Sequence, residues 1–142
     1  MSIADIFQKE GEKSFRDLET QVLKEIIQRH SLVIATGGGV VMRPENWGIL
    51  RQGIVVWIDT SRQQLITRLK LDQTKRPLLE KDHLVNSLDL LIKKRHPLYS
   101  ESDLHVHIEQ ETPKEVAFAI LNQLPNILIN RMNPNEQQTT AL

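Results

Sequence analysis

The sequence predicts an α/β fold in which helices cover a parallel sheet. Short runs of apolar residues alternate with longer segments whose apolar residues recur at helical spacing. Three consecutive glycines follow the first apolar run, where the ligands of parallel sheets usually bind. The chain has 142 residues, with 18 basic and 18 acidic side chains and no cysteine. This composition describes a single globular domain and excludes a disulfide framework or a cysteine-ligated metal site.

The N-terminal segment is predicted to be helical with one break. Ser2 and Asp5 have the spacing of a capping box, and Gly11 ends the short helix that they begin. A longer amphipathic helix follows over about residues 12–29. Its apolar stripe consists of Phe15, Leu18, Val22 and Ile26.

Three apolar runs are expected to form the sheet. Residues 32–35 predict a buried parallel strand that the glycines end, and residues 54–58 predict a second one. Pro44 suits the first turn of a short helix between them, to about Arg51. Residues 104–108 alternate between apolar residues and histidine, so we expect this strand at a sheet edge with one wetter face.

The remaining segments predict three helices and one loop. Ser61 and Gln64 indicate a capping box for a helix to about residue 71, and residues 72–81 lack periodicity and predict an exposed loop. Asp82 is expected to cap the next helix, which Pro97 should stop. The last helix is expected over about residues 112–124.

Charge and hydropathy exclude several classes of protein. The formal net charge is zero, which argues against a nucleic-acid or membrane-surface protein. No apolar run approaches the roughly 18 residues that span a bilayer, and the N-terminus lacks a signal region, so we expect a cytoplasmic protein. The Asn-, Gln- and Thr-rich end, from about residue 132, is expected to be disordered.

The glycine run and an arginine pair are candidate site residues. Gly37, Gly38 and Gly39 would let a ligand approach the backbone closely, although a tight connection without a ligand has the same pattern. Arg16 and Glu19 are three residues apart on one helix and can pair, either as part of a site or as an ordinary surface pair.

Other candidates are cations and histidines. Arg68, Arg76 and Arg95 could grip phosphate or carboxylate oxygens bidentately, or could be solvated charges. His105 and His107 point to one side of a strand, but no third ligand has an obvious spacing, so we expect exposed edge positions and no metal site. Trp47, Trp57 and Tyr99 are expected to serve packing.

Taken together, these segments resemble the shikimate kinase family, which has the P-loop kinase fold. They stand in the family's order and spacing over about residues 2–124, and each segment is weak alone but specific in combination. The segments are Ser2 to Phe7, Gly11-Glu12, Phe15-Arg16 with Glu19, Ala35 to Gly39, Arg76 to Leu79, and Arg95 with Pro97-Leu98-Tyr99.

The resemblance implies a three-layer α/β/α domain over residues 1–125, with a lid loop at about 72–81 and a C-terminal extension at 126–142. It also implies transfer of phosphate from MgATP to the 3-hydroxyl of shikimate, in the pathway to aromatic amino acids. The implied shikimate-binding residues are Arg16, Glu19, Gly37, Gly38, Gly39 and Arg95. The implied ATP-binding residues are Arg76, Thr112 and Pro113, and Arg68 and Arg76 are the implied catalytic residues.

One departure from the family pattern concerns its N-terminal part. Family members begin with a strand, a P-loop, a helix and a second strand, and no GxxxxGK[ST] motif occurs in these 142 residues. The Mg²⁺ ligand of that loop is therefore missing, and we expect an N-terminally truncated domain with two unpaired strand edges. The chain would then need a complementing segment or would self-associate, or it would be a noncatalytic remnant that binds shikimate or a partner.

Overall fold

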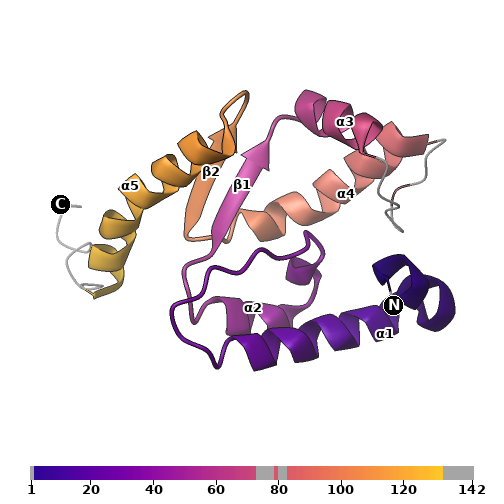
Figure 1. The fold of residues 1–142 in the computed structure, drawn as a ribbon, viewed down its shortest axis with the longest axis horizontal. Helices are drawn as coiled ribbons and strands as arrows, with labels where there is room; N and C mark the ends of the chain where they lie inside the picture. The colour runs from indigo at the N-terminus through magenta and orange to yellow at the C-terminus, as the bar shows by residue number, and fades with distance from the viewer. Residues whose placement is uncertain (1, 73–78, 80–82, 133–142) are drawn as a thin grey trace, which may run out of the picture.

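The computed structural model describes residues 2–72, 79 and 83–132, in which helices alternate with two strands (Figure 1). Among these residues no helix combines the length and the apolar character that crossing a membrane requires. The elements in chain order are α1 (Ile3–Ile26), the 3₁₀ helix η1 (Val40–Met42), α2 (Pro44–Leu50), β1 (Val56–Thr60), α3 (Arg62–Leu71), α4 (Leu84–Tyr99), β2 (Leu104–Ile108) and α5 (Pro113–Met132).

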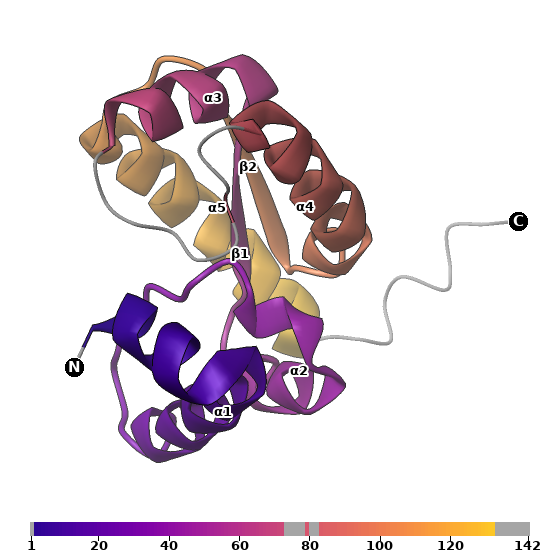
Figure 2. The same cartoon turned by 90° about the vertical axis from the view of Figure 1, so that its right-hand side faces the viewer.

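The sheet lies between helical layers, as the predicted fold class requires. Strands β1 and β2 pair in parallel, with Val56 opposite Leu104. Alternate residues of β2 are buried and pack against Val116 of α5. Trp57 faces the other way and contacts the rings of α4, so α4 and α5 cover opposite faces (Figure 2).

Helix α1 contains the predicted break. The Ser2 hydroxyl accepts the N–H of Asp5, whose carboxylate accepts the N–H of Ser2, so the predicted capping box is confirmed. Gly11 interrupts the helix at φ 82° and ψ 169°, a region that only glycine adopts without strain. Beyond this kink, α1 packs on η1 and α2 through a core of Leu23, Val40, Val41, Trp47 and Ile49.

The predicted strand over residues 32–35 is wrong. These residues are extended, but they join no sheet, and Val33 is fully exposed. A strand exists only through ladder hydrogen bonds, and no backbone hydrogen bond joins residues 32–36 to another described residue. The second predicted strand forms, shifted by two residues from 54–58 to Val56–Thr60.

Pro97 does not end its helix as expected. Helix α4 continues through Pro97 to Tyr99, and α5 also contains a proline, Pro125, and extends to Met132. Pro97 removes a single hydrogen bond close to the helix end, and the N–H of Ser100 still reaches the His96 carbonyl, so the last turn closes. The expected Asp82 cap, most of the expected lid and the tail beyond Met132 lie outside the described residues.

Candidate functional site

The predicted substrate residues gather around the glycine segment. A Cβ atom on Gly39 would lie 2.6 Å from Cζ of Arg16, and one on Gly38 would lie 3.2 Å from Nη1 of Arg95. A Cβ atom on Gly37 would be 3.7 Å from a carboxylate oxygen of Glu19. Residues from α1 and α4 therefore contact one backbone segment, which glycine alone allows them to approach so closely.

Arg16 is a buried cation rather than a surface charge. The residue is 8% exposed, and its Nη1 donates to Glu19 Oε2 at 2.7 Å. Glu12 Oε1 lies 3.4 Å from the Nε and Nη2 atoms of the same guanidinium. Two carboxylates from adjoining turns thus hold the guanidinium in place, as the spacing of Arg16 and Glu19 predicted.

A buried polar network fixes α1 against the segment that follows the glycines. Asn46 is fully buried, its Nδ2 donates to the Val40 carbonyl at 2.8 Å, and its Oδ1 accepts the Thr20 hydroxyl at 2.9 Å. Thr20 lies one turn after Arg16, so the network sets the position of Arg16 relative to η1. The role of Asn46 was not predicted from the sequence, because no local pattern distinguishes it from a surface asparagine.

Arg95 is the unsatisfied cation of the site. Its Nε atom is buried and has no hydrogen-bond partner among the described residues. Buried polar atoms in proteins almost always have a partner, so this N–H is expected to bind a ligand atom. The guanidinium also makes no ion pair within the described parts of the chain, unlike that of Arg16. Arg95 therefore supplies the uncompensated positive charge beside Gly38.

Tyr99 belongs to the same cluster, although packing alone was expected of it. Its hydroxyl donates to the Gly38 carbonyl at 2.7 Å. Tyr99 follows Arg95 by one helical turn, so the two side chains leave α4 on the same side. Two features of the sequence pointed to Tyr99, namely its i, i+4 spacing from Arg95 and its place in the segment Arg95 to Tyr99 of the family resemblance.

Three other predicted residues are not brought to this cluster. Arg68, on α3, reaches Gln64 of its own helix at 3.2 Å. Thr112 and Pro113 begin α5, where Thr112 and Glu115 exchange capping hydrogen bonds. No hydrogen bond in the described part of the chain links them to the glycine segment. Arg76 lies outside the described residues.

The two histidines of β2 have a carboxylate partner that their spacing did not reveal. Asp59 Oδ2 lies 3.0 Å from His105 Nε2 and 3.4 Å from His107 Nδ1. Parallel pairing places Asp59 opposite His107, a relation that local sequence cannot show. Within residues 2–72, 79 and 83–132, no group of three His, Asp or Glu side chains is arranged to hold a metal ion.

The resolved pKa shifts lie on the surface, away from the glycine segment. A hydrogen bond to Arg62 holds the pKa of Asp89 below its ordinary value, and this pair links α3 to α4. A hydrogen bond to Asp17 raises the pKa of Arg43, and this pair links α1 to the start of α2. These pairs link neighbouring elements at the surface and are not part of the site.

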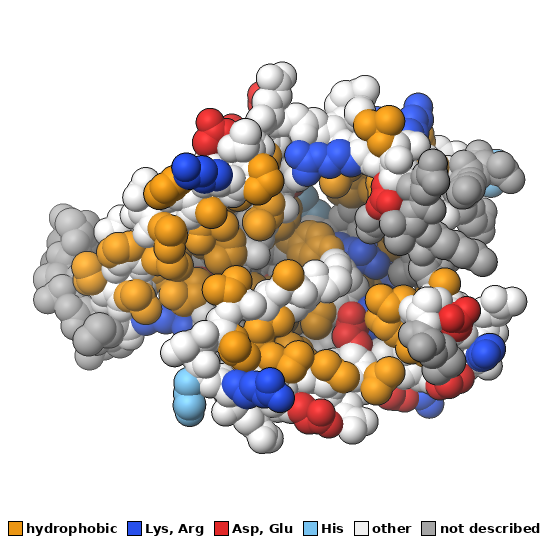
Figure 3. Space-filling view, viewed as in Figure 1, with side chains coloured by type: hydrophobic (Ala, Val, Ile, Leu, Met, Phe, Trp, Pro, Cys, Tyr) orange, Lys and Arg blue, Asp and Glu red, His pale blue; other side chains and the backbone are white. Residues whose placement is uncertain are grey.

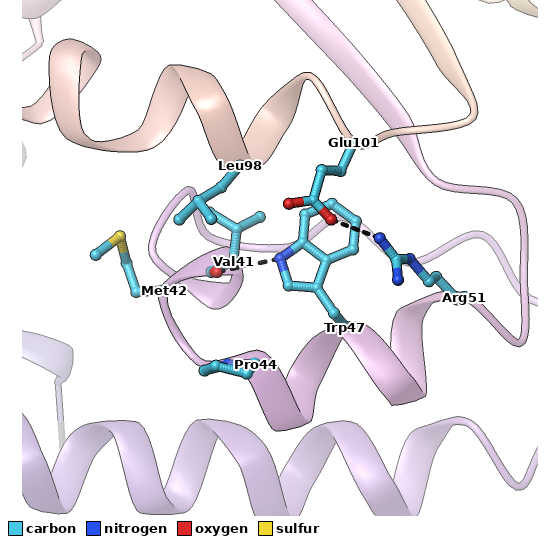
Figure 4. Close-up of a pocket in the computed structure, with 7 residues that line it drawn as sticks. All are labelled: Val41, Met42, Pro44, Trp47, Arg51, Leu98 and Glu101. Carbon is cyan, nitrogen blue, oxygen red and sulfur yellow. Dashed lines mark hydrogen bonds and ion pairs between the residues drawn. The ribbon is translucent and has the colours of Figure 1, made fainter.

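A separate hollow of about 260 Å³ lies between η1, α2 and the end of α4 (Figure 4). Its wall is largely apolar, and the Trp47 indole N–H donates to the Val41 carbonyl at 3.2 Å. Arg51 and Glu101 form an ion pair at one side. The polar groups are thus mutually satisfied, so we assign the hollow no ligand. Its lining residues are Val41, Met42, Pro44, Trp47, Arg51, Leu98 and Glu101.

Comparisons with known proteins agree on one family. The shikimate kinase family model matches residues 1–125. A shikimate kinase of Prochlorococcus marinus is 57% identical over 128 residues, which cover 89% of this chain and 67% of that protein. A Synechococcus shikimate kinase is 53% identical over 137 residues, covering 96% of this chain and 70% of that protein.

A solved structure is also similar over most of the chain. The structure of shikimate kinase from Acinetobacter baumannii in complex with shikimate matches with a TM-score of 0.83 and 38% identity. The match covers 88% of this chain and 70% of that one.

Proposed function

This chain belongs to the shikimate kinase family, and we propose that it binds shikimate on the glycine segment for phosphorylation of the 3-hydroxyl by ATP. The observation that carries the proposal is the buried, unpartnered Nε of Arg95 beside Gly38. A carboxylate would supply the missing acceptor and the missing negative charge together. The related Acinetobacter protein has been solved with shikimate, which carries such a carboxylate.

The proposed roles follow from the contacts of each residue. Arg95 and Arg16 hold the carboxylate, and Glu19 orients Arg16 through the 2.7 Å ion pair. The N–H groups of residues 37–39 serve as donors to the ring hydroxyls, because the glycines have no side chains of their own to cover this backbone.

The proposed ATP side has fewer described contacts. Arg76 and Arg68 would neutralise charge on the phosphates, and Thr112 with Pro113 would lie beside the adenine, as the family resemblance implies. Phosphoryl transfer depends mostly on positioning and charge neutralisation, so cations beside the phosphates suit the reaction.

The family uses ATP together with Mg²⁺. The described side chains contain no group of three His, Asp or Glu residues suited to a metal, and the 142 residues contain no GxxxxGK[ST] loop. These residues therefore do not fit the ion, and we assign it no site and no step in this chain. For these 142 residues we therefore propose shikimate binding, and turnover is tested separately.

Calorimetric titration of the full chain with shikimate tests the proposal. We expect binding that weakens in Arg16→Ala and Arg95→Ala, because losing a bidentate charged contact costs roughly 1.5 to 3 kcal/mol, or about 10- to 150-fold in Kd. Methyl shikimate, which lacks the carboxylate charge, should bind more weakly to the wild type by a similar factor. Arg29→Ala, at an exposed position just beyond α1, is the matched control and should bind as the wild type does.

The carboxylate clamp and turnover are tested by separate measurements. Equal affinity for shikimate and its methyl ester would refute the proposal that Arg16 and Arg95 bind the carboxylate. A coupled ADP-release assay on the same chain tests turnover separately, and shikimate-dependent ADP release would show that the chain is an active kinase rather than only a binding protein.

A further inference from the structure

We propose that Tyr99 is a positioning residue, whose hydroxyl holds the Gly38 carbonyl and thereby fixes the glycine segment in its shikimate-binding conformation. The inference rests on the proposed function and adds a residue to it. The hydroxyl donates at 2.7 Å to a carbonyl that lies 61 residues away in the chain, so the bond joins α4 to the segment before η1.

The glycine segment needs such an anchor. Glycine loses more conformational freedom on folding than any other residue, and three in succession make the cost largest here. The hydrogen bonds inside the segment involve its two ends, from Val40 N–H to the Gly37 carbonyl and from Met42 N–H to the Gly39 carbonyl. The carbonyl of Gly38 is held by Tyr99 instead.

Holding one carbonyl fixes more than one atom. The peptide unit is planar, so the direction of the Gly38 oxygen determines the direction of the Gly39 N–H on the opposite side of the same plane. Gly39 also lies against the Arg16 guanidinium. The Tyr99 hydroxyl therefore constrains a proposed backbone donor and the surface on which Arg16 rests.

The aromatic ring of Tyr99 is itself held in place by the sheet. It lies 5.7 Å from the ring of Trp57 on β1, measured between centroids. Trp57 is stacked on His105 of β2 at 4.0 Å and meets His96 of α4 edge to face at 5.0 Å. This chain of ring contacts connects both strands to the hydroxyl, so the anchor does not depend on α4 alone.

Arg95 and Tyr99 lie on the same face of α4 and have different roles. Both approach Gly38, since a Cβ atom there would lie 3.2 Å from Arg95 Nη1 and 2.7 Å from the Tyr99 hydroxyl oxygen. The arginine retains an unpartnered Nε, whereas the tyrosine uses its one hydroxyl proton within the protein. We therefore assign ligand contact to Arg95 and positioning to Tyr99.

The test compares Tyr99→Phe with Ser100→Ala in the full chain. Tyr99→Phe removes the hydroxyl and keeps the ring, while Ser100→Ala removes the neighbouring hydroxyl, which donates to the His96 carbonyl at 2.8 Å. In Tyr99→Phe we expect ¹⁵N order parameters of Gly38 and Gly39 to fall from about 0.85 to below about 0.6. The Kd for shikimate should rise about fivefold, the effect of one neutral hydrogen bond. Ser100→Ala should change neither quantity.

Each measurement can overturn the proposal. Wild-type order at Gly38 and Gly39 in Tyr99→Phe would show that the hydroxyl does not hold the segment. Lost order with unchanged shikimate affinity would show that the segment's conformation does not matter for binding. An equal loss of affinity in Ser100→Ala would show that the loss is not specific to the Tyr99 hydroxyl. If the wild-type chain binds no shikimate, the proposed function fails, and the order parameters still decide whether Tyr99 holds the segment.

Discussion

Gly39 is the residue at which a single atom matters most. A Cβ atom there would be 2.6 Å from Cζ of Arg16, far inside the contact distance of two carbon atoms. Arg16 has little room to move, because Glu19 and Glu12 hold its guanidinium and the residue is buried. A methyl group at this position must therefore displace either the glycine segment or the proposed substrate cation.

Gly39→Ala is accordingly expected to lower the free energy of unfolding by about 1 to 3 kcal/mol, the usual cost of overpacking. Shikimate binding should weaken as Arg16 moves. Gly48→Ala is the matched control, since nothing lies within 4 Å of a Cβ atom there and the position is inside α2. That change should stabilise the protein by about 0.5 to 1 kcal/mol. Urea denaturation of both variants gives these values, and equal stability of the two would refute the close contact.

At the scale of elements, the predicted caps at Ser2, Ser61 and Thr112 stand where helices begin. The cap of α5 is the most complete of these. Glu115 Oε2 accepts both the N–H and the hydroxyl of Thr112, at 2.7 and 2.8 Å, and the N–H of Glu115 donates back to the Thr112 hydroxyl at 3.3 Å. The hydrogen bond from the Thr112 N–H is the main reason why the pKa of Glu115 lies below its ordinary value of 4.5.

This lowered pKa makes the stability of the α5 cap depend on pH. A carboxyl group with a depressed pKa in the folded state stabilises the protein above its unfolded pKa, and the contribution disappears as the pH falls through the folded value. Glu115→Gln should therefore have a lower Tm than the wild type at pH 7, and the difference should shrink below about pH 4.5. Glu10→Gln, on the exposed side of α1, should have a wild-type Tm at both pH values. A difference that is constant from pH 7 to pH 3 would mean that the charge of Glu115 does not support the cap.

At the scale of the whole molecule, local signals predicted the helices well and the sheet only in part. The caps at Ser2, Ser61 and Thr112 are hydrogen bonds between residues three apart, so a short local segment of sequence contains both partners. The extended run at 32–35 has the composition of a strand, but a strand also needs a partner, and composition cannot supply one.

The same distinction applies to the site. Arg16 and Glu19 could be paired from their spacing, and the family resemblance joined them to Gly39 and Arg95. Tyr99 was missed because its partner Gly38 is 61 residues away, and Asp59 was missed because only the parallel register places it opposite His107. Contacts of this kind arise from tertiary packing, which periodicity does not record.

The extended segment at residues 32–34 gives the molecule an unsatisfied apolar surface. Leu32, Val33 and Ile34 are all exposed, and no backbone hydrogen bond links them to another described residue. The space-filling view shows further apolar side chains at the surface, gathered over α5 (Figure 3). Of these surfaces, the extended segment is the more prone to pair with another chain, because it offers unpaired N–H and C=O groups as well as β-branched side chains.

We therefore expect the chain to self-associate as its concentration rises, through strand pairing at this segment. Val33→Lys should reduce the association, since a lysine on an exposed strand edge opposes pairing with a second strand. Val22→Lys is the control, because Val22 is also exposed but lies in α1, where the helix already satisfies the backbone. Light scattering over a concentration series should show a lower average mass for Val33→Lys than for the wild type at each concentration. Val22→Lys should have the mass of the wild type. An equal reduction in both variants would indicate general apolar adhesion instead of strand pairing, and a wild-type chain that stays monomeric throughout would contradict the prediction.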